Sequence, residues 1–404
     1  MMAKTVLFVA YGSGHIKMLI PVAQALAASG LGRPVVLALT TAAPAARAAG
    51  LDVVQFKDFV VPADAPALDH GRRLMADLGA PVADAEETMA YLGLSFADLV
   101  AELGPAQAEA NYREKGRQAF LPTATLTRII KKIRPDLVVA TNSPRAERAA
   151  IVAAGQLGIP SVCVVDLFAI DEVKWIGDVS YADRVCVLNE SVRQFLIASG
   201  RHEAQVVVTG NPAFDALNDA AAIAQGQQLR HARGWADKRV VLWPNQVEPS
   251  VHPFDGRSGN PCLPAQALGL LMDWALSRHD VVLCIRARAG EHPPVIPVDP
   301  RIVLTGQDWP LAPLLHAADM VVTLSSTVGL EGHLAGCRLL QVLGSVFDAA
   351  MPLARYGIAD AAVRLGPASP FLQALNHWVV APRRAAQHVL PATAQVLAVI
   401  GGLL

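Results

Sequence analysis

The sequence has almost no net charge and few charged side chains. Lys plus Arg number 34 and Asp plus Glu number 35, so the formal charge is -1. Charged residues make up 17% of the chain, below the roughly 25% usual for soluble domains. Because a basic surplus is absent, nucleic acid is not an expected partner. Hydrophobic residues make up 53%, which excludes general disorder.

Long apolar runs and paired cysteines are also absent. A bilayer-spanning helix needs about 20 nearly uncharged residues, and the candidate at 396–404 is too short. The N-terminal residues 1–15 lack the apolar core and cleavage site of a signal peptide. We therefore expect a cytoplasmic protein with no integral membrane span, although Arg383 and Arg384 leave peripheral membrane contact open. The cysteines form no CxxC pair and are predicted to be free core residues: Cys163, Cys186, Cys262, Cys284 and Cys337.

Short β-branched runs alternate with Ala- and Leu-rich helical stretches along the whole chain. The first half contains TVLFVA, RPVVLALT, DLVVAT and IPSVCVVD, and the second contains KRVVLWP, DVVLCIR, RIVLTG and DMVVTLS. Continuous apolar strands alternating with helices predict parallel sheets that are covered on both faces. A chain of 404 residues is about twice a comfortable single domain. We therefore predict an α/β fold of two doubly wound, Rossmann-like domains that face each other across a cleft.

The composition also suggests where the domains begin and end. The first domain is predicted at 1–217 and the second at 237–378, joined by an Ala- and Gln-rich linker at 218–236. A C-terminal helix at 379–404 is predicted to pack back on the rest. Residues 61–125 are helical in pattern and rich in carboxylates, which predicts an insertion. This insertion is either a lid or acceptor surface or a solvated helical cover.

The first candidate ligand motif is YGSGH at residues 11–15, between a strand and a helix. Gly12 and Gly14 allow a tight turn, and backbone N–H groups of Gly12, Ser13 and Gly14 can hold an anion. A free imidazole has a pKa near 6.5, so a neutral histidine ring at position 15 can take a proton from an acceptor hydroxyl; His15 is therefore the candidate base. The alternative is an ordinary strand-to-helix turn with a polar residue at the start of the helix.

The second candidate motif is LSSTVGLEG at residues 324–332, again between a strand and a helix. The hydroxyls of Ser325, Ser326 and Thr327 at a helix start suit a diphosphate. Glu331 can accept hydrogen bonds from both ribose hydroxyls. The alternative is an N-capped helix with a glutamate about one turn later.

Three further positions lie at strand ends. Arg286 and Arg288 can grip phosphate oxygens, unless one of them faces solvent along its strand. Asp166 ends a buried strand and is predicted either to orient His15 or to contact the acceptor. The histidines near these loops show no metal-binding spacing: His252, His292 and His333.

SSTVGLE resembles the S-G-T-x-T-L-E stretch of lipid-A-disaccharide synthases and the S-G-G-x-x-E-E stretch of UDP-N-acetylglucosamine 2-epimerases, two families of the GT-B superfamily. VTGNPAFDAL at 208–217 is similar to the epimerase V-T-G-N-x-x-x-D-A-L. GHIKM at 14–18 resembles the epimerase A-I-K-M run and the Gly-rich loop ending in His of the lipid-II-forming N-acetylglucosaminyltransferase. The resemblance implies the GT-B fold and a UDP-type donor, with Glu331 on the ribose and Gln307 in the loop that holds the base.

The sequence also departs from the epimerase pattern. The epimerase H-R-R-E-N loop is replaced by WPNQVEP at 243–249, and its G-D-T by ATN at 140–142. Epimerisation needs several placed acids and bases. Glycosyl transfer needs one base and a stabilised leaving group, which His15 and the loop containing Asn245 and Gln246 can supply.

We therefore predict a metal-independent glycosyltransferase without a bound cofactor. It would move an N-acetylglucosamine-like sugar from a UDP-type nucleotide-sugar donor to a hydroxyl acceptor that the sequence does not identify. Two alternatives stay open: a UDP-sugar 2-epimerase or hydrolase of the same fold, and a nucleotide-sugar-binding protein without catalysis.

Overall fold

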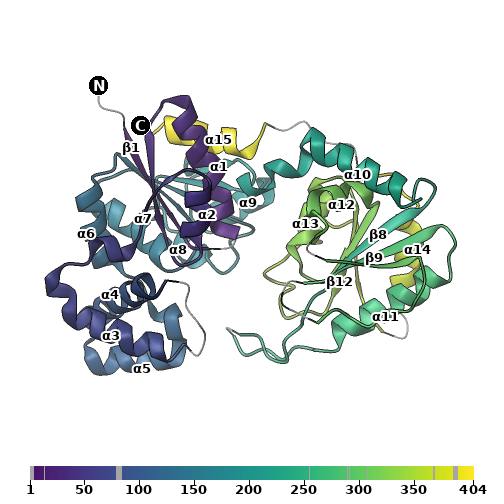
Figure 1. Cartoon of the computed structure of the whole chain (residues 1–404), viewed down its shortest axis with the longest axis horizontal. Coiled ribbons are helices and arrows are strands. Elements are labelled where there is room, and N and C mark those ends of the chain that lie inside the picture. Colours follow the sequence, from purple (N-terminus) through teal and green to yellow (C-terminus); the bar gives the residue numbers. More distant parts are fainter. Residues whose placement is uncertain are drawn as a thin grey trace. The chain divides into compact units, whose positions relative to one another are not determined.

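A computed structural model describes residues 4–12, 14–78, 84–253, 255–288, 290, 292–306, 308–366, 369–384 and 390–404. The chain divides into two compact units. Unit 1 comprises Met1–Ala213 and Leu390–Leu404, and unit 2 comprises Phe214–Val389. Strands alternate with helices in each unit (Figure 1), so the predicted α/β class is confirmed.

Unit 1 is built on a parallel sheet, whose described strands run in the order β3-β2-β1-β4-β5-β6-β7. The strands are β1 Thr5–Ala10, β2 Arg33–Ala38, β3 Asp52–Val54, β4 Leu137–Thr141, β5 Ser161–Val164, β6 Arg184–Val187 and β7 Val206–Val208. The chain adds β2 and β3 on one side of β1 and then crosses to β4 on the other side. Ligands of such sheets bind outside the carboxyl ends of the strands at this switch point.

Helices cover the sheet of unit 1 and include the last helix of the chain. They are α1 Gly14–Ser29, α2 Ala42–Ala48, α6 Thr123–Ile133, α7 Ala146–Gln156, α8 Val173–Ile176, α9 Glu190–Ala198 and α15 Ala392–Gly401, with a 3-10 turn η4 at Glu203–Gln205. Val396 and Ile400 of α15 are fully buried in the same core as Phe8 of β1 and Leu19 of α1. The C-terminal helix is therefore part of the first unit's core.

The segment between β3 and α6 forms a helical subdomain beside the sheet of unit 1 (Figure 1). It contains η1 Phe56–Phe59, η2 Pro62–Asp64, α3 Ala65–Ala76, α4 Ala85–Leu103, α5 Pro105–Lys115 and η3 Gly116–Ala119. Helices α3 and α4 cross at two glycines: a Cβ on Gly71 would lie 2.0 Å from the Met89 carbonyl oxygen, and one on Gly93 would lie 2.2 Å from that of Ala67. Side chains would separate these helices, so the crossing requires glycine.

Unit 2 repeats the topology of unit 1, because its described strands run in the order β10-β9-β8-β11-β12-β13, all parallel. They are β8 Arg239–Pro244, β9 Val281–Arg286, β10 Ile302–Thr305, β11 Met320–Thr323, β12 Arg338–Leu343 and β13 Ala361–Arg364. The helices are α10 Ala220–Ala232, α11 Leu263–Leu276, α12 Leu311–Ala317, α13 Thr327–Leu334 and α14 Phe371–Val379; η5 Pro212–Asn218 begins in unit 1 and ends in unit 2. This is the Rossmann strand order, with the switch point between β8 and β11.

The predicted linker is largely helix α10, which packs against α12 within unit 2. A Cβ on Gly226 would lie 2.5 Å from the Cβ of His316, so the two helices are in close contact. Arg230 reinforces this packing, because its guanidinium pairs with Asp319 at 2.9 Å and donates to the Ala317 carbonyl at 2.7 Å.

The two arginines considered for membrane contact are used inside unit 2. The Arg383 guanidinium donates to the Leu315 carbonyl at 3.0 Å. The Arg384 guanidinium donates to the Cys337 carbonyl at 2.6 Å and pairs with Asp360 at 2.8 Å. These bonds fasten the segment after α14 to α12 and to the residues that precede β12 and β13, so both guanidinium groups have partners within unit 2.

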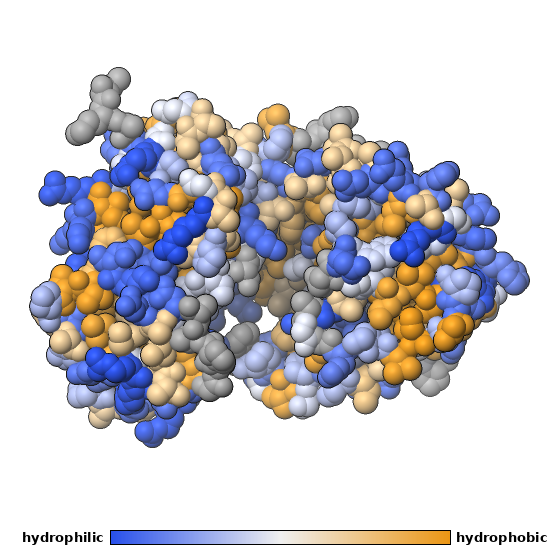
Figure 2. Space-filling model, viewed as in Figure 1, coloured by the Kyte–Doolittle hydropathy of each residue, from blue (hydrophilic) through white to orange (hydrophobic). Residues whose placement is uncertain are grey.

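On the face shown in Figure 2, hydrophilic side chains surround scattered hydrophobic patches on both units. Among the described residues, no helix combines the length and the hydropathy that crossing a membrane requires.

Candidate functional site

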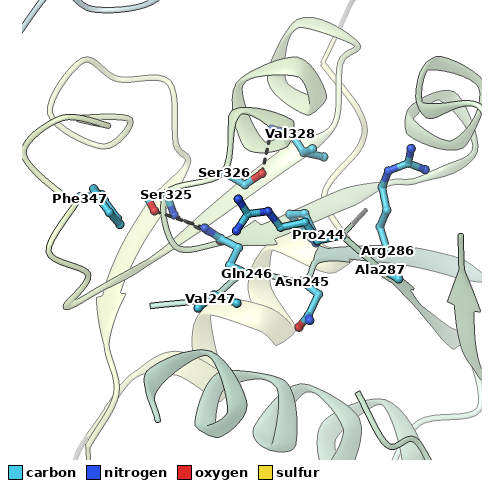
Figure 3. A pocket seen from close by; sticks show the side chains of 11 residues that line it. Pro244, Asn245, Gln246, Val247, Arg286, Ala287, Ser325, Ser326, Val328 and Phe347 are labelled. Atoms are coloured by element: carbon cyan, nitrogen blue, oxygen red, sulfur yellow. Dashed lines mark hydrogen bonds between the residues drawn. The ribbon is translucent and has the colours of Figure 1, made fainter. Parts of the chain in front are cut away.

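A cavity of ≈ 330 Å³ lies at the switch point of unit 2. This volume is in the range of small-molecule sites. The cavity is lined by Pro244, Asn245, Gln246, Val247, Arg286, Ala287, Arg288, Ser325, Ser326, Val328 and Phe347 (Figure 3). The structure therefore brings together six residues predicted to bind a nucleotide sugar: Asn245, Gln246, Arg286, Arg288, Ser325 and Ser326.

Gln246 lines the cavity and connects two of the loops around it, the one after β8 and the one after β11 (Figure 3). Its Oε1 accepts hydrogen bonds from Thr323 Oγ1 at 2.9 Å and from Leu324 N at 3.0 Å. Its Nε2 donates to Ser325 Oγ at 3.3 Å. Because its side chain joins the end of β8 to the loop after β11, Gln246 fixes the position of the loop that carries Ser325 and Ser326 (the serine loop), which was predicted to hold phosphates.

Ser326 is the N-cap of α13, whose first turn faces the cavity. Its Oγ accepts a hydrogen bond from Val328 N at 3.2 Å, so the capped-helix alternative is confirmed for this residue. The positive end of the helix dipole also favours an anion here. Gly329 has a packing role, since a Cβ there would lie 2.6 Å from Thr323 Cγ2.

The cations of the cavity have different surroundings. Arg286 is half-buried and donates to the Trp309 carbonyl at 2.8 Å, which fastens the loop after β10. Burial lowers the pKa of Arg286, and the negative charges of Glu331 and Asp308 oppose that shift. Glu331 thus lies within electrostatic range of Arg286, although it does not line the cavity. Arg288 lines the cavity directly.

A third loop, after β12, also borders the cavity, and the sequence analysis did not find it. Asp348 Oδ2 accepts from Gly344 N at 2.8 Å, whereas its Oδ1 is buried without a hydrogen-bond partner among the described residues. Burial raises the pKa of Asp348, and Arg364 opposes the shift. Gly344 has φ +121, so this glycine was the available sequence signal for a sharp turn.

The YGSGH motif lies at the switch point of unit 1, directly after β1. A Cβ on Gly12 would lie 1.7 Å from Thr41 Oγ1, so packing against the loop after β2 explains this glycine. By contrast, a Cβ on Gly14 would meet nothing within 4 Å. His15 is half-buried in the first turn of α1, and its Nδ1 is enclosed without a hydrogen-bond partner in the described part of the chain.

Asp166 belongs to a polar network at the carboxyl ends of β4, β5 and β7. Its Oδ1 accepts from Asn142 Nδ2 at 2.9 Å and from its neighbour Leu167 N at 2.7 Å. Asn211 Nδ2 donates to the Asp166 carbonyl at 2.7 Å. No hydrogen bond joins Asp166 to His15 in the residues that the structure describes, so direct orientation of His15 by Asp166 is not observed.

Glu172 is a second carboxyl in this network that the sequence analysis overlooked. Burial, together with the charge of Asp166, raises the pKa of Glu172 to about 7, and a hydrogen bond with Asn142 opposes the shift. Between these acids, Ala169 adopts φ 54, a left-handed conformation that costs energy in a non-glycine residue. Strained loops holding a carboxyl that titrates near neutrality are typical of functional sites.

The remaining predicted positions are accounted for as follows. Ser13 and Gln307 lie outside the described residues. Thr327 is the first residue of α13 and is not among the cavity-lining residues.

His252 Nδ1 lies 2.9 Å from Asp255 Oδ1 in a hairpin after β8. Within the described ranges, no group of three or more His, Cys, Asp or Glu side chains is placed to hold a metal ion.

Neither models of protein families nor curated protein sequences match this chain. Solved structures do match. The calicheamicin glycosyltransferase CalG4 superposes with a TM-score of 0.58 at 16% identity, covering 100% of this chain and 99% of that one. UDP-GlcNAc 2-epimerase from Methanocaldococcus jannaschii gives 0.57 at 10% identity, covering 98% and 99%. UDP-GlcNAc 2-epimerase from Neisseria meningitidis bound to UDP-GlcNAc gives 0.53 at 12% identity, covering 98% and 99%.

These likenesses extend over the whole chain, and they agree with the strand order of both units. The chain therefore has the GT-B fold, as the sequence resemblance implied. At these identities the comparisons define the fold alone. The activity has to be argued from the residues at the two switch points.

Proposed function

We propose that the protein is a GT-B glycosyltransferase that moves a sugar, N-acetylglucosamine or a relative, from a UDP-type donor to a hydroxyl acceptor. The observation that supports this most is the unit 2 cavity, where Arg288, two serine hydroxyls and the N-terminus of α13 converge. This donor set suits a diphosphate. A fold neighbour is described as bound to UDP-GlcNAc, which supports the choice of donor.

In this mechanism, unit 2 binds the donor and stabilises its leaving diphosphate. Ser325 and Ser326 donate hydroxyl hydrogen bonds to phosphate oxygens, and Arg288 offsets the charge that develops on the leaving group. Gln246 keeps the serine loop in place. Glu331 binds the ribose hydroxyls. Since the protein's own cations and dipoles supply the positive charge, the reaction is proposed to proceed without a metal ion.

Unit 1 supplies the base in this proposal. The neutral ring of His15 removes the proton of the acceptor hydroxyl as the acceptor oxygen attacks the anomeric carbon. The bond between that carbon and the diphosphate breaks, and the diphosphate leaves with the electron pair. Gly14 leaves room for the ligand beside the start of α1, and Asp166 contacts the acceptor.

The first experiment is a thermal-shift panel of UDP, dTDP, GDP and CMP together with their sugars, because a ligand that binds the native state raises its melting temperature. We expect UDP compounds to give the largest shifts. Product formation is then measured with UDP-N-acetylglucosamine and a set of hydroxyl acceptors. His15→Gln should abolish transfer and keep the UDP shift. His202→Gln, at an exposed histidine next to η4, is the matched control. An unchanged rate in His15→Gln would refute the base assignment.

The carboxyl network of unit 1 favours one second candidate, a UDP-sugar 2-epimerase or hydrolase. Such reactions need several acids and bases, and Glu172 adds one carboxyl to Asp166, which the sequence analysis had already credited. Incubation with UDP-N-acetylglucosamine alone separates the two functions. Free UDP together with N-acetylmannosamine supports the second candidate, whereas sugar transfer only in the presence of an acceptor supports the first.

A further inference from the structure

Two apolar side chains border the unit 2 cavity from opposite loops. Val247 follows the end of β8 and Phe347 follows the end of β12, and both line the cavity (Figure 3). The Val247 side chain is 57% exposed. Phe347 is half-buried and packs against His252 with the rings tilted, with 5.2 Å between the ring centroids. Neither side chain takes part in the phosphate contacts proposed above.

A buried carboxylate fixes these two loops to each other. Glu248 is 4% exposed. It accepts hydrogen bonds from Ser345 Oγ at 2.8 Å and from Val346 N at 2.7 Å. Since Glu248 follows Val247 and Val346 precedes Phe347, these bonds set the positions of both apolar side chains. A Cβ on Gly259 would lie 2.1 Å from the Pro249 carbonyl and 3.0 Å from Val346 Cγ1, so the loops are also closely packed.

The cavity is therefore lined by both polar and apolar side chains. Ser325, Ser326 and Arg288 are among the polar ones, and Val247 and Phe347 are among the apolar ones. A sugar hydroxyl placed against Val247 and Phe347 would gain no hydrogen-bond partner from them. A methyl group placed there would bury apolar surface. This difference discriminates between sugars that differ in a single substituent.

We propose that Val247 and Phe347 form a specificity subsite for a methyl-bearing substituent on the donor sugar, with Glu248 as the positioning residue. The acetamido group of an N-acetyl sugar and the methyl group of a 6-deoxy sugar share this chemistry. The inference rests on the proposed function, because it requires that the cavity bind a nucleotide sugar. It adds which part of the sugar is recognised and by which side chains.

The test measures dissociation constants by calorimetry for UDP, UDP-glucose, UDP-N-acetylglucosamine and UDP-6-deoxyglucose. In the wild-type protein we expect at least one methyl-bearing donor to bind about 10-fold or more tightly than UDP-glucose. If neither methyl-bearing donor is preferred, the inference is overturned while UDP binding still supports the proposed function. If UDP itself does not bind, the proposed function fails and the inference fails with it.

Two variants test the named side chains. Val247→Thr is nearly isosteric and lies on an exposed position, so it replaces a methyl by a hydroxyl without a folding defect. We expect it to reduce the preference for the methyl-bearing donor about 3-fold or more and to leave UDP affinity unchanged. Val247→Ile is the apolar control and should keep the preference. An equal loss of affinity for UDP and for all three sugars would contradict the proposed subsite.

Glu248→Leu tests the positioning role. A leucine side chain accepts no hydrogen bond, so both bonds to the loop after β12 are lost. We expect the preference for the methyl-bearing donor to fall while UDP binding persists, and Glu248→Asp to restore part of it. A variant that folds, as judged by its melting temperature, and retains the full preference would remove Glu248 from this role.

Discussion

Replacing Gln246 by glutamate tests whether a diphosphate lies in the unit 2 cavity. Gln246 Oε1 accepts hydrogen bonds from Thr323 Oγ1 and Leu324 N, and a carboxylate oxygen can accept the same bonds. Its Nε2 donates to Ser325 Oγ at 3.3 Å, and the serine hydroxyl can rotate to donate to the new oxygen instead. The substitution thus preserves the shape of the loop after β11 and adds one negative charge to the lining of the cavity.

The size of the effect follows from Coulomb's law. Two unit charges about 4 to 8 Å apart interact by roughly 2–4 kcal/mol at an effective dielectric constant of about 20. Because the cavity opens to solvent, the lower end of that range applies, which is about a 30-fold loss of affinity. Added salt should reduce the loss, since it screens the repulsion.

The assay is calorimetric titration with UDP, UMP and uridine at low and at raised salt. We expect Gln246→Glu to weaken UDP most, UMP less and uridine little, with a melting temperature close to that of the wild type. Gln246→Met is the comparison variant, because it removes the loop bonds without adding charge. Equal weakening of UDP and uridine, or unchanged UDP affinity, would refute the placement of the diphosphate.

Three further outcomes follow from the structure. His15→Ala should lower kcat by about 10²–10⁴-fold with little change in donor affinity, as steady-state kinetics and calorimetry can check. Gly14→Ala should fold normally and lose activity, because the ligand is proposed to approach the start of α1; full activity in this variant would contradict that approach. Gly12→Ala should instead lower the unfolding free energy by about 1–3 kcal/mol through its clash with Thr41. Burial raises the pKa of Glu87 to about 7, above its ordinary value, so the native state favours the protonated acid. Its contribution to the unfolding free energy is fully present below about pH 4.5 and falls by about 3 kcal/mol as pH rises through 7. Chemical denaturation should therefore show that the unfolding free energy changes less between pH 5 and pH 8 in Glu87→Gln than in the wild type. An equal change in the two proteins would refute the assignment.

The fold could be predicted from the sequence because parallel sheets buried on both faces produce continuous apolar runs. TVLFVA became β1 and DVVLCIR became β9, and each is nearly completely buried. The ends of two other strands were also predictable as ligand-binding positions, since Asn245 follows β8 directly and Ser325 lies two residues after β11. Whether a strand is buried can be predicted from its own side chains, because a strand covered on both faces is apolar at successive positions.

The third wall of the cavity and the carboxyl network could not be predicted in this way. Phe347 reaches the cavity only because β12 lies beside β11 in the sheet. Glu172 meets Asn142 through the turn after β5, and the strained conformation of Ala169 contributes to that turn. Such contacts depend on strand order and loop conformation, which no short motif encodes.

Packing accounts for one glycine of the first ligand motif. A Cβ on Gly12 would clash with Thr41, so this position requires glycine whether or not its backbone N–H binds an anion. A motif with two glycines therefore does not reveal which glycine serves a ligand. In the first motif, only Gly14 combines open space with a place at the start of a helix.

Hydrogen exchange measured by mass spectrometry with and without UDP tests the central claim most directly, namely that the unit 2 cavity binds a nucleoside diphosphate. We predict that saturating UDP slows amide exchange in peptides covering residues 244–248, 285–288 and 323–330. Unchanged exchange in these three segments, with slower exchange elsewhere in the chain, would contradict the account.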